Sequence, residues 1–204
     1  MDICEVCETG IARSKTGRPR RFCSNACRQK AYRRESKTRA ELYAEANRHI
    51  IPEDLRIRNR WVRHIGKRPL AIGGWFCSVN DERAFSTYAA VKESTRGDGY
   101  GFVLNGDGVV CIDLDDCVVD GQPNRAAQNL IDTLPETYVE FSPSGNGLHI
   151  WGFGKMEKGR RFSDDGLKIE VYPSARFITV TARPYVRARL AILDLHRALR
   201  VLAV

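Results

Sequence analysis

Short apolar runs alternate with turn-forming residues along most of the chain, from about Leu55 onward. Each run has the length and the β-branched and aromatic content that favour a strand. The runs are GFVL at 101–104, VVCIDLD at 109–115, YVEFS at 138–142, LHIWGF at 148–153, LKIEVY at 167–172 and RFITVT at 176–181. We expect a strand in each.

The segments between paired runs carry residues that favour tight turns. The first pair is separated by NGDG at 105–108, the second by PSGNG at 143–147 and the third by PSA at 173–175. Gly, Asn, Asp and Pro readily adopt turn conformations. We therefore predict three β-hairpins and a largely antiparallel sheet.

Helical patterns appear between and after these runs. Gln122–Leu134 predicts one helix, and Arg187–Val204 has apolar residues at helical spacing. Hairpins combined with helices are typical of an α+β fold. We expect a mostly antiparallel sheet with flanking helices over residues 55–204.

The N-terminal part of the chain has a different pattern. Residues 1–27 hold two cysteine pairs, and residues 28–48 contain neither Gly nor Pro and are rich in polar helix formers. We expect an exposed helix there, ended by Ile51-Pro52. Three zones result: a cysteine module (1–27), a basic helical linker (28–54) and a globular domain (55–204).

Composition narrows the class of protein. The chain has 204 residues, 43% of them hydrophobic, which is enough for one packed core and a small appendage. It has no uninterrupted apolar run of about 18 residues, so we expect no membrane span. The N-terminus MDICEVCETG lacks the pattern of a secretory signal, so we expect a cytoplasmic protein in a reducing compartment.

The positive charge is concentrated at one end. Residues 1–60 hold 15 Lys and Arg against 8 Asp and Glu, whereas residues 61–204 hold 18 against 17. The net charge of +8 therefore lies almost entirely in the N-terminal third. A basic arm on a neutral body suggests a polyanionic partner, nucleic acid first.

Four of the seven cysteines predict a zinc site. Cys4, Cys7, Cys23 and Cys27 have the spacing C-x2-C-x15-C-x3-C, which allows four thiolates to surround Zn²⁺ as a tetrahedron. The alternative is four free cysteines in an arm without metal. The other three, Cys77, Cys111 and Cys117, lie in apolar contexts and are expected in the core, not in disulfides.

The second cysteine pair leads into the basic sequence CRQKAYRR. The cationic residues expected near the metal are Arg28, Lys30, Arg33 and Arg34. The region resembles small zinc ribbons in which such a pair precedes a basic helix. We favour nucleic-acid binding over a purely anchoring role because of the charge.

An acid pair in the second run is the first sign of catalysis. Side chains alternate along a strand, so Asp113 and Asp115 should share one face, with Ile112 and Leu114 on the other. Adjacent carboxylates suit Mg²⁺ or Mn²⁺. Such pairs also arise by chance and in glycosyltransferases. The neighbouring Asp116 is a rival ligand that should face away on a regular strand.

Two further groups follow in chain order. His149 begins a strand after the turn at 143–147, whose backbone N–H groups we expect to be free for phosphate; a surface hairpin with a half-buried histidine is the alternative. Glu170 lies in an apolar strand, where an acid needs a cation. An ordinary ion pair between Glu170 and Arg176 across the third hairpin is the alternative.

The combination is more specific than its parts. The order is an acid pair, then S-x-S-G-x-G-x-H, then E-x-Y with R-F-x-T-V-T. It resembles the primase–polymerase domain of the archaeo-eukaryotic primase superfamily, in its phage and plasmid replication branch. The resemblance runs from about Asn59 to Tyr185 and includes the segments NRWV and KRPL. It implies a primase–polymerase core with an RRM-like sheet.

The resemblance also implies roles for individual residues. Asp113, Asp115 and Glu170 would be the catalytic ligands of Mg²⁺ or Mn²⁺. The residues expected to contact the nucleotide triphosphate are His149, Ser144, Gly145, Arg176 and Lys67.

The expected function is template-directed nucleotidyl transfer, as a primase, a DNA polymerase or both. The expected partners are DNA template and primer, nucleoside triphosphates and a separate replicative helicase, because no helicase domain follows the tail. A phage-encoded enzyme would act in the bacterial host cytoplasm. The alternatives are a non-catalytic zinc-ribbon protein that binds nucleic acid, and a different metal-dependent phosphoryl transferase or nuclease.

Overall fold

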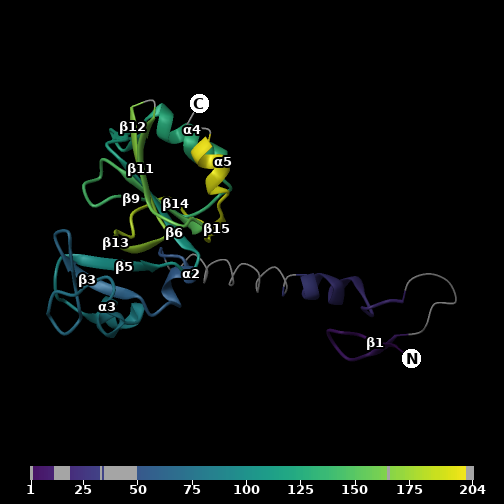
Figure 1. Cartoon of the computed structure of the whole chain (residues 1–204). Helices are drawn as coiled ribbons and strands as arrows, with labels where there is room; N and C mark the ends of the chain where they lie inside the picture. Colours follow the sequence, from purple (N-terminus) through teal and green to yellow (C-terminus); the bar gives the residue numbers. More distant parts are fainter. Residues whose placement is uncertain (1, 12–18, 33, 35–49, 165, 201–204) are drawn as a thin grey trace. The chain divides into compact units, whose positions relative to one another are not determined.

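A computed structural model describes residues 2–11, 19–32, 34, 50–164 and 166–200 (Figure 1). The chain divides into two compact units, Met1–His49 and Ile50–Val204. The second unit begins ahead of β3, because Ile51 and Leu55 are both buried in its core.

The N-terminal unit contains a small antiparallel hairpin and a helical segment. Strands β1 (Asp2–Ile3) and β2 (Gly10–Ile11) pair with each other. Residues 25–32 are helical, in agreement with the start of the predicted helix. Positions 35–48 of that prediction lie outside the described residues.

The second unit is α+β, as predicted, with two main sheets and few helices. Its helices are α2 (Glu53–Arg56), a 3-10 turn at Glu82–Ala84, α3 (Tyr88–Glu93), α4 (Arg125–Thr133) and α5 (Leu195–Arg200). Its strands are β3 (Trp61–Ile65), β4 (Arg68–Leu70), β5 (Gly99–Asn105), β6 (Val109–Asp115), β7 (Val118–Val119), β8 (Gln122–Pro123), β9 (Val139–Phe141), β10 (Leu148–Phe153), β11 (Arg160–Asp164), β12 (Leu167–Tyr172), β13 (Ser174–Val180), β14 (Pro184–Val186) and β15 (Ala191–Ile192).

The larger sheet has the strand order β11-β12-β6-β10-β9-β14, with β15 pairing at the end of β10. All neighbours are antiparallel except β15 and β10. Helices α4 and α5 cover one face (Figure 1), where Ile112, Leu114 and Ile150 pack against Leu130 and Ala198. The alternating strand pattern therefore leaves the polar residues of β6 on the opposite face.

The smaller sheet has the order β13-β5-β3-β4. Its apolar side chains join a second buried cluster that also includes residues of the larger sheet. Phe102 of β5 makes edge-to-face contacts with Trp61 and with Trp151, at centroid distances of 5.2 and 5.8 Å. The site face of the larger sheet is therefore partly covered by the smaller one.

Two of the three predicted hairpins are wrong, although their strands are present. Strands β5 and β6 belong to different sheets, and so do β12 and β13. A strand has two edges, and both edges of β6 are occupied, by β10 and by β12. The turns at 105–108 and 173–175 are thus crossings between sheets, and they lie side by side, with Gly106 N donating to Pro173 O at 3.1 Å. The middle hairpin, β9 with β10, is confirmed.

The predicted helices are shorter than expected. Gln122 and Pro123 form β8, and α4 begins after Asn124, whose side chain accepts from Ala127 N at 2.9 Å. In the tail, Ala191–Ile192 pairs with β10, and α5 begins only at Leu195. Local helix propensity is overridden in both places by strand pairing and by a polar cap.

The three cysteines outside the N-terminal group are buried or half-buried. Cys111 and Cys117 are buried and Cys77 is half-buried, and none of them forms a disulfide. Within the described ranges, no helix is long and apolar enough to cross a membrane.

Candidate active site and cysteine cluster

A row of five ionisable side chains runs across the larger sheet. The strand register places Arg161 opposite Glu170, Glu170 opposite Asp113, Asp113 opposite His149, and His149 opposite Glu140. The row therefore crosses β11, β12, β6, β10 and β9 in spatial order. Residues directly opposite on neighbouring strands have adjacent side chains, so neighbouring charges of this row interact with one another.

Asp113 lies at the centre of the row. Its side chain is 23% exposed and, as predicted, lies on the face opposite the helix-covered core residues Ile112 and Leu114. Burial raises the pKa of the Asp113 carboxyl, and the negative charges of Asp115 and Glu170 raise it further. A carboxyl destabilised in this way favours a nearby cation.

His149 is buried between two carboxylates, so the half-buried surface histidine that was the alternative is excluded. Its Nε2 lies 3.7 Å from Oδ1 of Asp113, and its Nδ1 lies 3.5 Å from Oε1 of Glu140. Nδ1 has no hydrogen-bond partner among the described residues. Burial disfavours the charged imidazole, but Glu140 and Asp113 outweigh burial, and the pKa of His149 is raised.

Glu140 was not identified from the sequence. Its carboxylate is fully buried. It accepts five hydrogen bonds, from Tyr138 Oη, Trp151 Nε1, Thr181 N, Thr181 Oγ1 and Ala182 N. A buried carboxylate is costly unless its oxygens accept hydrogen bonds, as these do. The available signal was an acid between Val139 and Phe141, the same feature that singled out Glu170.

Glu170 has cationic and phenolic partners. Nε of Arg161 lies 2.8 Å from its Oε1, and the hydroxyl of Tyr172 donates to its Oε2. Arg176 donates to the Tyr172 hydroxyl at 3.0 Å and stacks on the ring, 4.5 Å from its centroid. The direct ion pair between Glu170 and Arg176 is not formed; Arg161 on β11 takes that place.

Three backbone N–H groups of the turn before β10 are hydrogen-bonded within the turn, whereas the sequence predicted that they would be free. Gly145 N donates to Ser142 O, Asn146 N to Ser144 Oγ, and Gly147 N to Ser142 Oγ. Two serine hydroxyls and one carbonyl of the turn therefore accept these three hydrogen bonds. Arg183 lies over it, because a Cβ at Gly145 would be 3.2 Å from its guanidinium.

The exposed end of β6 borders an open pocket. Its volume is about 310 Å³, and it is lined by Asp115, Arg161, Phe162, Ser163, Lys168, Ile169 and Glu170. Asp116 lies just past the strand with a positive φ of 51°, so the regular-strand argument does not apply to it. It pairs with Lys168 at 2.7 Å.

Lys67 comes from the other sheet. It lies in the turn between β3 and β4 and is exposed. Its positive charge lowers the pKa of Asp113, opposing burial and the neighbouring carboxylates. The smaller sheet therefore contributes a cation to the surroundings of the acid row.

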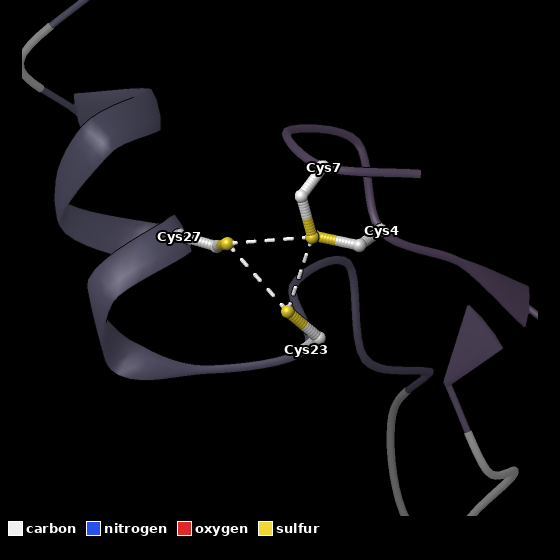
Figure 2. Close-up of side chains that lie close together, drawn as sticks. All are labelled: Cys4, Cys7, Cys23 and Cys27. Carbon is white, nitrogen blue, oxygen red and sulfur yellow. Dashed lines mark hydrogen bonds between the residues drawn. The ribbon is translucent and has the colours of Figure 1, made fainter. Parts of the chain in front are cut away.

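The four N-terminal cysteines converge, as Figure 2 shows. The potential ligand atoms of all four lie within 4.8 Å of one another, a spacing that no other group of three or more His, Cys, Asp or Glu residues reaches within the described residues. Sulfur–sulfur distances are 3.4 Å for Cys7–Cys23, 3.5 Å for Cys23–Cys27 and 3.7 Å for Cys27–Cys7. Four sulfurs about 2.3 Å from a tetrahedral Zn²⁺ would lie about 3.8 Å apart, so the cluster fits that ion.

Mutual hydrogen bonding perturbs these thiols. The backbone N–H of Cys23 lowers the pKa of Cys4 to about 6. Hydrogen bonds with Cys7 and Cys27 raise the pKa of Cys23 to about 12. Thiols that share protons in this way readily exchange them for a metal ion.

The basic residues after the cluster are partly described. Arg28, Lys30 and Arg34 are exposed. Arg33 lies outside the described residues.

Comparison with known proteins shows a similarity to a phage protein. A curated protein of Nitratiruptor phage NrS-1, described as a DNA primase-polymerase, is 37% identical over 122 residues. The match covers 52% of this chain but only 17% of the phage protein. No protein-family model matches the chain.

Proposed function

We propose that the second unit catalyses template-directed nucleotidyl transfer, as a primase, a DNA polymerase or both, in phage- or plasmid-type DNA replication. The observation that carries the proposal is the row that joins Asp113, Glu170 and His149 on one sheet face. The similarity to a phage DNA primase-polymerase supports the same chemistry.

The acids would hold Mg²⁺ or Mn²⁺. Asp113 and Asp115 share a face, and Glu170 is directly opposite Asp113, an arrangement of like charges that a divalent cation would relieve. Glu170 would become a third ligand of the ion if its side chain turned away from Arg161. Bound ions would activate the attacking 3′-hydroxyl and stabilise charge on the reacting phosphates.

His149 and nearby cations would orient the nucleotide. Glu140 holds the Nδ1 side of the ring, which aims Nε2 toward Asp113. A triphosphate beside Asp113 would receive a hydrogen bond from Nε2, with Lys67 and Arg176 as further phosphate contacts. Accurate positioning of this kind supplies much of the rate in phosphoryl transfer.

Ser144 and Gly145 were expected to contact the triphosphate, but we propose that they shape the turn instead. Their hydrogen bonds fix the shape of the turn that precedes His149. We propose that this turn supports the histidine and that Arg183 contributes the adjacent positive charge.

The N-terminal unit would bind zinc and hold DNA. Four converging thiols supply the ligands, and Arg28, Lys30, Arg33 and Arg34 supply positive charge for phosphates. Zinc would also stabilise a unit too small for a large core.

A primer-extension assay tests the proposal. Labelled primer on a DNA template is incubated with nucleotides and Mg²⁺ or Mn²⁺, and products are resolved by length. We expect extension by the wild-type chain and a loss of at least a hundredfold in Asp113→Asn, because the central ligand is gone. Asp120→Asn is the matched control, since Asp120 is exposed at a positive φ that Asn also accepts.

Each outcome separates the candidate functions. Primer shortening in place of growth would assign the acids to a nuclease, and an Asp113→Asn variant with full synthesis would remove the acid row from catalysis. Absence of any reaction with either metal would favour a non-catalytic protein that binds nucleic acid.

A further inference from the structure

The loop after β4 exposes two neighbouring aromatic rings. Trp75 is 54% exposed and Phe76 is 45% exposed, whereas the other tryptophans, Trp61 and Trp151, are fully buried. Large exposed aromatic side chains at adjacent positions are costly to keep in water and commonly mark a binding surface.

The loop is held by its backbone. Ala71 N donates to Trp75 O at 2.9 Å, and Gly74 N donates to Ala71 O at 2.9 Å. Phe76 forms a bridge with Leu70, and Cys77 N donates to Pro69 O at 3.1 Å. The two rings are thus presented from a closed turn anchored to β4.

Glycines let the side chains lie flat on this turn. A Cβ at Gly73 would be 1.9 Å from the Trp75 ring, so the indole rests on the Gly73 backbone. A Cβ at Gly74 would be 2.7 Å from the Arg96 guanidinium, so Arg96 rests on the next residue. One face of the indole is supported in this way.

Positive charges are interleaved with the rings. The guanidinium of Arg68 lies 3.8 Å from the centroid of Phe76. Lys67, Arg68 and Arg96 are all exposed, and within the described part of the chain none of the three forms an ion pair with an acidic side chain. We call Lys67, Arg68, Trp75, Phe76 and Arg96 the aromatic–arginine surface.

We infer that the aromatic–arginine surface binds single-stranded DNA, with an unpaired base stacked on Trp75 and phosphates held by Arg68 and Arg96. Aromatic stacking with cationic backbone contacts is how proteins hold single strands without reading sequence. A protein partner would also accept exposed rings, but the guanidinium groups of Arg68 and Arg96 beside them favour a polyanion.

The inference deepens the proposed function and rests on it for the identity of the strand. Lys67 adjoins Arg68 in the chain and lies in the turn between β3 and β4. The strand bound at the aromatic–arginine surface would serve as template or as primer end.

Tryptophan fluorescence of the full chain reports on this surface directly, because Trp75 is the exposed tryptophan of the three. The probe is single-stranded oligothymidylate, with a duplex of equal length for comparison. We expect quenching by the single strand, a smaller response to the duplex, and no quenching in Trp75→Phe, which removes the reporter but keeps a ring.

Affinity is measured separately, by anisotropy of a labelled oligothymidylate. We expect Trp75→Ala to weaken binding on the order of tenfold and Trp75→Phe to retain most of the affinity. Val119→Ala, at an exposed apolar position of β7, is the matched control and should bind as the wild type does. Circular dichroism verifies that each variant folds.

Two results would overturn the inference. One is unchanged affinity in Trp75→Ala together with unquenched fluorescence at saturating oligonucleotide. The other is an altered oligomeric state in Trp75→Ala with unaltered affinity, which would assign the surface to a protein contact.

Failure of the proposed polymerase activity can be distinguished from failure of the inferred DNA binding. Quenching that persists in Asp113→Asn, with no synthesis by the wild type, would support the surface and reject the polymerase. Synthesis by the wild type, with Trp75 fluorescence unchanged by the single strand, would support the polymerase and reject the aromatic–arginine surface.

Discussion

Glu140 lies at one end of the polar row and is fully buried. Its Oε1 lies 3.5 Å from Nδ1 of His149, on the side of the ring opposite Asp113. Its five hydrogen bonds fix the carboxylate, so the ring beside it has one favoured orientation.

We expect Glu140→Gln to raise the nucleotide KM severalfold and to lower stability by about 1–3 kcal/mol, because the amide turns an acceptor into a donor among existing donors. Steady-state kinetics gives KM and kcat, and urea unfolding gives the stability. Glu136→Gln, exposed in the preceding loop, is the control. A stability loss with unchanged KM would limit Glu140 to a structural role.

His149→Ala should raise the nucleotide KM by roughly tenfold or more, the scale of a lost hydrogen bond to a charged group, while template binding changes little. Initial rates over a nucleotide series and anisotropy with labelled template measure the two effects. Weaker template binding with an unaltered KM would place His149 outside the nucleotide site.

The sequence was informative at this scale where strand alternation applied. It placed Asp113 and Asp115 on one face and noted Glu170 as an acid among apolar residues. The hairpin of β9 and β10 was predicted, but its register, which places Glu140 opposite His149, was not. A shift of one residue would have turned Glu140 to the other face of the sheet.

At the scale of elements, Asp107 stabilises the crossing from β5 to β6. Its carboxylate accepts from Arg58 at 3.1 Å and from the buried Arg60 at 2.8 Å, and it accepts from Val109 N at 3.2 Å. Burial opposes the charge, but these partners outweigh burial and lower the pKa of Asp107.

Asp107→Asn should therefore lower stability by about 1–3 kcal/mol at neutral pH, because Arg60 loses its anion; part of the pair is solvent-screened. Since the folded pKa is lowered, the contribution of Asp107 is present above its unfolded pKa and is lost as pH falls through the folded value. Urea unfolding at several pH values should show the gap between wild type and variant closing in acid. A gap independent of pH would contradict the electrostatic account.

The two crossings between sheets also show that a local sequence pattern does not determine which strands pair. Glycine-rich turns at 105–108 and short turns at 173–175 are compatible with a hairpin and with a change of sheet. The choice depends on which strand edges are free, and β6 has none for β5. The six strands predicted from the sequence are present, but only one of their three predicted pairings, β9 with β10, is correct.

At the scale of the whole molecule, the excess positive charge and the cysteine cluster both lie in the N-terminal part of the chain. The basic excess lies in residues 1–60, together with the converging cysteines. We expect about one zinc per chain by elemental analysis of purified protein.

Cys23→Ser should remove the zinc and weaken DNA binding, because the metal organises the basic segment. Cys77→Ser, at a half-buried cysteine outside the cluster, should keep both. A wild-type chain without metal whose thiols react freely would leave the cysteines as ordinary side chains.

The paired crossings between sheets have a consequence for how the protein can be made. β5 finds one partner, β3, close by in the chain, but its other partner, β13, is synthesised only at residues 174–180. Contacts so distant in sequence slow folding and leave strand edges open meanwhile. A nascent chain that stops before β13 lacks one edge strand of the smaller sheet and also lacks β14 and β15 of the larger one. We therefore expect C-terminal truncations that remove β13 to leave an edge of β5 unpaired and to aggregate more readily than the whole chain.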